Sequence, residues 1–152
     1  MNILFGVGNP LLGDDGIGNY TVAGFHAHGW TAYDCGTVPE NFTSLVRKFR
    51  PAVLAIVDAA DLGLPPGEFR VVPGEYIEDV SIGTHQLPLT HLIEFLKDCT
   101  GKIIFIGIQP RSLVFGTALS SEARSGADRL IQLLEEGAIG TIPEFTGRSK
   151  HS

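Results

Sequence analysis

Two adjacent carboxylates, Asp14 and Asp15, lie within the glycine-rich stretch GVGNPLLGDDGIG at residues 6–18. A glycine-rich turn after an apolar strand is typical of a phosphate site, but two acids would repel a phosphate. A Rossmann fingerprint would need a third glycine where Leu11 stands, and the Walker pattern Gly-Lys-Ser/Thr is absent from the sequence. An acid that caps a helix starting near Gly16 would explain one of the pair. We therefore expect one acid to brace the loop and the other to point into a cleft.

Two further side chains could act together with this pair. Asp58 interrupts the apolar run AVLAIVDAAD, where a carboxylate is costly unless it is paired, hydrogen-bonded or bound to a metal. His85 follows Thr84 just before an expected helix, whose N-terminus favours the neutral, metal-binding imidazole. The simpler alternatives are a polar strand end for Asp58 and an ordinary loop residue for His85.

Convergence of Asp15, Asp58 and His85 would form an O,O,N site with open coordination positions. Such ligands suit zinc, nickel or iron, and a substrate group or water would complete the shell. Two close acids could instead share a proton and act as an acid/base pair. Either chemistry ends in hydrolysis. We expect the remaining polar candidates to be solvated: His26, His28, His91 and Asp61.

The elements that must position these side chains alternate between strand and helix. Apolar runs predict strands at residues 2–7, 31–36, 52–61, 68–72 and 102–110. Apolar residues at helical spacing predict helices at residues 16–28, 39–49, 84–99 and 120–137. This order predicts a single three-layer α/β domain, with a mostly parallel sheet covered by helices on both faces. We place the domain at residues 1–143 and expect 144–152 to be a polar C-terminal tail.

The carboxyl ends of parallel strands meet at one edge of the sheet, where ligands bind. That edge would bring together the 8–18 loop, Asp58 and the Ile108–Gln109–Pro110 strand end, with His85 within reach. The glycine loop and the two strand ends therefore predict one shared site.

Composition restricts the possible partners. The chain has 152 residues, 43% of them hydrophobic, and a net charge of −6, with scattered Lys and Arg, which argues against nucleic acid. No apolar run approaches the ~20 residues that cross a bilayer, and the N-terminus lacks the pattern of a signal peptide. Cys35 and Cys99 offer no disulfide framework. We expect a cytoplasmic protein with no membrane partner, and we expect a monomer.

The motifs GVGNPLLGDDGIG, IVDAAD, THQLPL and IGIQP, in this order, resemble those of the hydrogenase maturation endopeptidases, in particular the branch that serves hydrogenase 3 of formate hydrogenlyase. The resemblance covers nearly the whole chain. It implies an endopeptidase, aspartic-type or metal-assisted, that removes the C-terminal extension of the [NiFe]-hydrogenase large-subunit precursor after nickel insertion. It also implies that Asp15, Asp58 and His85 contact nickel supplied by the precursor, with Asp15 and Asp58 catalytic. Asp14 is left to brace the loop, and the glycines would let the loop admit a bulky partner.

Several alternatives remain open at this stage. The nickel would either polarise the carbonyl or activate water, or it would be a recognition handle while Asp15 or Asp58 acts as general base. Cys35 replaces a glycine that is common in the family. It could stiffen a loop near the site, place a soft thiolate near the nickel, or be a small buried residue. A metal-dependent hydrolase of another peptide or amide could use the same residues. The non-enzyme alternative is a nucleotide- or metal-binding regulatory module.

Overall fold

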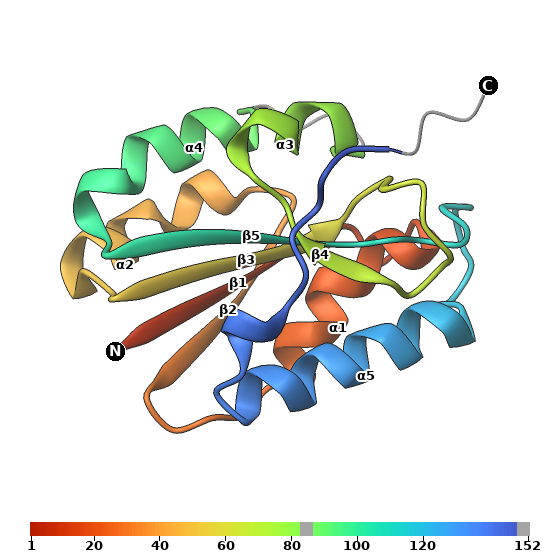
Figure 1. Cartoon of the computed structure of the whole chain (residues 1–152), viewed down its shortest axis with the longest axis horizontal. Helices are drawn as coiled ribbons and strands as arrows, with labels where there is room; N and C mark the ends of the chain where they lie inside the picture. The colour runs from red at the N-terminus through yellow and green to blue at the C-terminus, as the bar shows by residue number, and fades with distance from the viewer. Residues whose placement is uncertain (83–86, 149–152) are drawn as a thin grey trace.

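The computed structural model describes residues 1–82 and 87–148. Five strands in this part of the chain form one sheet in the order β2-β1-β3-β5-β4 (Figure 1). The pairs β1–β2, β1–β3 and β3–β5 are parallel, and β4 runs antiparallel to β5. The strands are β1 (Asn2–Val7), β2 (Trp30–Gly36), β3 (Val53–Ala59), β4 (Phe69–Val71) and β5 (Lys102–Ile108).

Helices cover both faces of the sheet (Figure 1). The helices α1 (Ile17–Gly24) and α5 (Ser121–Glu135) pack on one face. The opposite face carries α2 (Thr43–Phe49), α3 (Gly74–Val80) and α4 (Leu89–Leu96). Short 3₁₀ turns extend several of these elements: η1 (Gly13–Gly16), η2 (Pro39–Phe42), η3 (Lys97–Cys99) and η4 (Ile139–Thr141). The predicted three-layer α/β domain is therefore confirmed.

Alternate residues of the central strands contribute to two separate cores. On β1, Ile3 and Phe5 pack with α2, α3 and α4, whereas Leu4 packs with α1 and α5. On β3, Ile56 and Val57 divide between the two cores in the same way. Because both faces are covered, the strands consist of continuous apolar runs rather than alternating ones.

The helices differ in length from their predicted ranges. The predicted helix at 84–99 begins only at Leu89, with Pro88 as its N-cap, and ends in η3. Helix α3 was not predicted, because it has seven residues and buries only Ile77 and Val80, which is too short a pattern to recognise. None of the helices that the structure describes is both long and apolar enough to cross a membrane.

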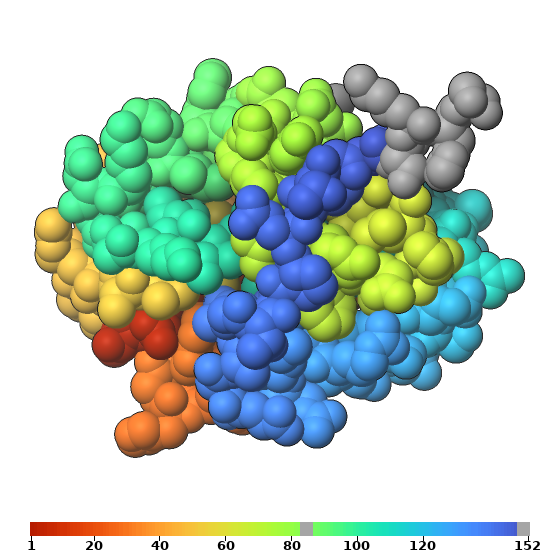
Figure 2. Space-filling view, viewed as in Figure 1, coloured from red at the N-terminus to blue at the C-terminus, as the bar shows by residue number. Residues whose placement is uncertain are grey.

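Packing of the chain continues past residue 143. The amide of Val71 donates to the carbonyl of Pro143 (3.0 Å), and the amide of Phe145 donates to the carbonyl of Val71 (2.7 Å). The Phe145 ring is buried edge-on to Tyr76, with 5.3 Å between ring centroids. Figure 2 shows this segment in dark blue as a band across the surface. Phe145 thus belongs to the core, while a domain boundary at 143 stays a prediction.

Candidate active site

The direction in which the strands are added to the sheet reverses between β1 and β3. The chain after β1 leads through α1 to β2 on one side, whereas the chain after β3 leads to β5 and β4 on the other. Ligands of open α/β sheets bind beyond the carboxyl ends of the strands at such a switch point. Asp15 lies in η1, which follows β1, and Asp58 lies near the end of β3. The fold therefore brings both predicted acids to the ends of adjacent strands.

Two glycines allow η1 and α1 to approach the sheet closely. A Cβ on Gly18 would lie 2.2 Å from the backbone oxygen of Val7 and 2.6 Å from that of Val57. A Cβ on Gly8 would lie 2.0 Å from the backbone oxygen of Asp15. Only glycine fits at such distances. These glycines pack the loop tightly against the strands, and the expectation that the loop admits a bulky partner stays a prediction.

Asp15 closes its own loop and is half-buried. One of its carboxylate oxygens, Oδ2, accepts a hydrogen bond from the backbone N–H of Asn9 (3.0 Å). The Asn9 side chain in turn accepts from the backbone N–H of Leu11 (3.0 Å). These contacts hold the backbone from residue 9 to 15 in a compact turn, and Asp15 remains partly exposed.

Asp58 is far less accessible than Asp15. Only 1% of its surface is exposed. Its register partner on the neighbouring strand β5 is Gly107, which has no side chain. A buried carboxylate is stable only with polar or cationic partners. Its place on the strand next to β1 makes it the second acid of the candidate site.

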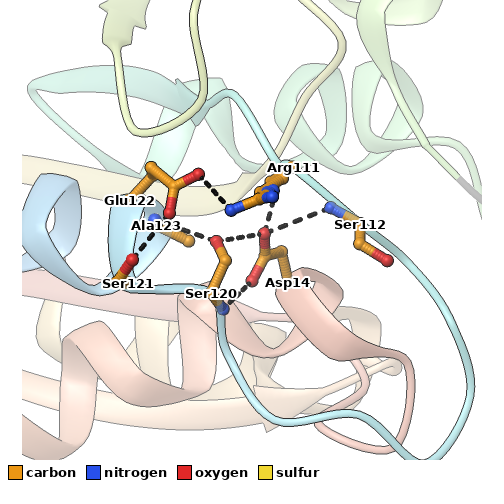
Figure 3. A network of polar contacts seen from close by, with 7 residues as sticks. All are labelled: Asp14, Arg111, Ser112, Ser120, Ser121, Glu122 and Ala123. Atoms are coloured by element: carbon orange, nitrogen blue, oxygen red, sulfur yellow. Dashed lines mark hydrogen bonds and ion pairs between the residues drawn. The ribbon is translucent and has the colours of Figure 1, made fainter.

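Asp14 has no exposed surface and braces the loop, as predicted (Figure 3). Its Oδ2 accepts hydrogen bonds from the backbone N–H groups of Arg111 (2.8 Å) and Ser112 (3.3 Å). Ser120 donates its backbone N–H to Oδ1 and its hydroxyl to Oδ2, both at 2.7 Å. The alternative in which an acid caps α1 was wrong for Asp14, since the N-cap of that helix is Gly16.

The hydrogen bonds to Asp14 also determine its charge. Burial alone would raise the pKa of this carboxyl group, but the donors from Ser120, Arg111 and Ser112 outweigh it and hold the pKa below the ordinary value of 3.8. Asp14 is therefore a buried anion at neutral pH, and the donors to its carboxylate lie between the end of β5 and the start of α5.

Gln109 fixes the loop that follows β3. Its side-chain oxygen accepts from the backbone N–H groups of Leu62 (2.6 Å) and Leu64 (3.3 Å). The sequence placed Gln109 at this edge of the sheet but gave it no role. The available signal was an amide side chain at the end of a buried apolar run, where it needs hydrogen-bond partners.

His85 lies outside the described residues, so its place beside Asp15 and Asp58 stays a prediction. Within residues 1–82 and 87–148, no group of three or more His, Cys, Asp or Glu could hold a metal ion. The predicted O,O,N site therefore depends on His85. The other candidates are exposed, as predicted: His26, His28, His91 and Asp61.

Cys35 is a small buried residue of the core. Its surface is 2% exposed, and both it and Cys99 are free thiols. Burial, together with the nearby carboxylates of Asp34 and Glu40, raises the pKa of the Cys35 thiol well above its ordinary value. The structure thus favours the buried-residue interpretation over a thiolate near nickel.

Similarity to known proteins identifies the family. Residues 20–137 match the family model of HycI, hydrogenase maturation protease. The chain belongs to this family. The hydrogenase 3 maturation protease of Escherichia coli K12 is 38% identical over 138 residues, which cover 88% of each chain. The solution structure of the E. coli endopeptidase HycI aligns with a TM-score of 0.88 and 34% identity over 99% of both chains.

A third relative is known from a crystal structure. The [NiFe] hydrogenase maturation protease HycI from Thermococcus kodakarensis has a TM-score of 0.79 and 28% identity, over 90% of this chain and 91% of its own. The predicted resemblance, fold class and enzyme class are thus confirmed: this hydrogenase maturation protease family member is a protease, not a regulatory binding module.

Proposed function

We propose that this protease removes the C-terminal extension of a [NiFe]-hydrogenase large-subunit precursor after nickel insertion. Two relatives carry hydrogenase maturation in their names, and one is named for hydrogenase 3. The observation that carries the proposal is the placement of Asp15 and Asp58 on adjacent strand ends at the switch point of the sheet. This is the position where an α/β protein acts on its ligand.

The nickel belongs to the substrate in this proposal. Asp15 and Asp58 would supply oxygen ligands, and His85 a nitrogen ligand, to nickel already bound in the precursor. Oxygen and imidazole ligands suit nickel. With only three ligands from the protease, the remaining coordination positions of the nickel stay occupied by the ligands of the precursor. The protease would thereby distinguish a loaded precursor from an empty one.

The chemistry at the peptide bond needs a carbonyl made more electrophilic or a water made more nucleophilic. The nickel could supply either effect as a Lewis acid. Alternatively, it could serve as the recognition handle, with one carboxylate taking the proton of the attacking water. In both forms Asp15, the more accessible acid, meets the substrate first, and Asp58 completes the site from the end of β3.

Exposed apolar side chains beside the site support a protein substrate rather than a small amide. Leu11 is 60% exposed, Val114 59% and Phe115 72%. The backbone N–H of Gly116 donates to the carbonyl of Leu11 (2.8 Å), so the loops that carry these residues lie side by side. Clustered apolar surface of this kind marks protein interaction sites. A folded precursor would use it, whereas a small amide would not need it.

Replacement of Asp58 by Asn tests the site directly. We expect Asp58→Asn to lower the cleavage rate of nickel-loaded precursor at least about 100-fold, because an amide neither binds nickel as an anion nor accepts a proton. Mass spectrometry of the released C-terminal peptide gives the rate, and circular dichroism monitors the fold.

Asp61→Asn is the matched control, since Asp61 is an exposed acid three residues further on. It pairs with Arg148 at the surface (2.8 Å), and such pairs contribute little to stability. Asp61→Asn should cleave like the wild type. Normal cleavage by a folded Asp58→Asn variant would show that Asp58 is not part of the active site.

A further inference from the structure

A single carboxylate fastens both ends of the connection between β5 and α5. Arg111 and Ser112, at the start of this connection, donate backbone N–H groups to Asp14. Ser120, at its end, donates both its backbone N–H and its hydroxyl to the same carboxylate (Figure 3). The backbone N–H of Asp14 also donates to the carbonyl of Ser112 (2.8 Å). The segment from 111 to 120 is thus a loop closed on residue 14.

Ser120 extends this junction into α5. Its Oγ is the N-cap acceptor of the helix and receives the backbone N–H of Ala123 (3.1 Å), while its proton is donated to Asp14. One hydroxyl therefore joins the first turn of a 15-residue helix to the buried carboxylate. Because Asp14 is fully buried, it cannot exchange these donors for water without local opening.

The two loops are also interlocked by shape. Gly13 has a φ of 57°, and a Cβ at this position would lie 2.7 Å from both the carbonyl oxygen of Ser112 and the hydroxyl of Thr117. The 3₁₀ turn that carries Asp15 is therefore pressed against the 111–120 loop, and no side chain could separate them.

We infer that Asp14 and Ser120 act as positioning residues for Asp15, an inference that rests on the proposed function. Asp14 cannot touch the substrate, since it has no exposed surface. It precedes Asp15 within the four-residue turn η1, so a shift of its carboxylate moves the neighbouring one. The junction holds η1 against α5 and so fixes the Asp15 carboxylate for contact with the nickel-bearing precursor.

The test is the kinetics of three variants of the full chain on nickel-loaded precursor. Ser120→Ala removes the hydroxyl. Asp14→Asn keeps the helix cap but replaces the carboxylate by a neutral amide. Ser120→Thr keeps a hydroxyl that can both cap the helix and donate to Asp14. We expect the first two to lower kcat about 100-fold, with KM changed by less than about threefold, because small displacements of a catalytic group have such effects. Ser120→Thr should restore most of the rate.

Leu134→Ala separates positioning from lost stability. Leu134 is buried near the C-terminal end of α5, whereas Ser120 caps its N-terminus, so truncation of Leu134 leaves the junction intact. This control should have a lower Tm and a wild-type kcat at temperatures where it is folded. A folded Ser120→Ala variant with a wild-type kcat would overturn the inference while leaving the proposed function in place.

Hydrogen exchange provides a readout that does not depend on the substrate. In Ser120→Ala, the amides of residues 13–16 and 111–117 should exchange faster than in the wild type, and those of the central strands should not. Unchanged exchange at 13–16 would overturn the inference regardless of what the protein cleaves. Absence of cleavage by the wild type would instead count against the proposed function alone.

Discussion

Asp14 and Asp15 have the same side chain and occupy opposite environments. Asp14 is fully buried and accepts four hydrogen bonds from residues of the loop between β5 and α5, far from it in sequence. Asp15 is half-buried and faces the edge of the sheet, with the backbone of Asn9 as a local partner. One acid is thus structural and the other accessible. The residues alone predicted this division of labour, and only the family resemblance indicated which acid was which.

Asp14 should make stability depend on pH in a defined direction. Its pKa in the folded protein is lower than the ordinary value of 3.8, so its ionised form stabilises the fold fully above that value. The contribution is lost as the pH falls through the pKa of the folded state. We expect Asp14→Asn to lower the free energy of unfolding at pH 6 by about 3 kcal/mol, as buried charge-assisted hydrogen bonds are lost.

Urea unfolding of both proteins from pH 7 to pH 3 measures this effect. The difference in the free energy of unfolding between wild type and Asp14→Asn should be constant above about pH 5. It should narrow below about pH 4, where protonation of Asp14 removes its contribution to the stability of the wild type. A difference in the free energy of unfolding that widens toward low pH would contradict the lowered pKa of Asp14.

At the scale of elements, a glycine determines how close α1 lies to the sheet. Gly18→Ala would place a methyl group 2.2 Å from the backbone oxygen of Val7, so α1 must move away from β1 and β3. We expect a loss of about 3 kcal/mol in the free energy of unfolding, at the upper end for overpacking, together with reduced cleavage because η1 moves with the helix. Thermal unfolding and the cleavage assay measure both.

Gly74→Ala is the matched control in another helix. Gly74 is the first residue of α3, and a Cβ there would meet nothing within 4 Å. This variant should be neutral or slightly stabilising, because alanine restricts the unfolded chain. Equal destabilisation by the two substitutions would show that close packing of α1 is not the reason for Gly18.

Some elements were readable from the sequence, and others were not, for physical reasons. β1 and β3 are buried on both faces, so their apolar runs stand out, and α5 carries a regular apolar stripe. Helix α3 has only two buried residues and no such stripe. Asp14 and Ser120 are 106 positions apart in the sequence, and no local sequence pattern predicts a contact over that distance.

For the whole molecule, the place of the candidate site follows from the topology rather than from any one motif. The rule that strand ends gather at one edge was enough to predict that Asp15, Asp58 and Gln109 would share it. The strand order β2-β1-β3-β5-β4 and the antiparallel direction of β4 depend on long-range pairing, which the sequence does not display. Asp15 and Asp58 lie at the predicted edge, while the metal set stays a prediction because it depends on His85.

The most direct measurement of the proposed function is cleavage of a cognate large-subunit precursor, prepared with and without nickel and analysed by mass spectrometry. We expect the wild-type protein to release a C-terminal peptide from the nickel-loaded form and to leave the nickel-free form intact, because Asp15 and Asp58 would engage nickel held by the precursor. Equal cleavage of both forms would contradict recognition through substrate-borne nickel. Cleavage of neither form would contradict the proposed substrate.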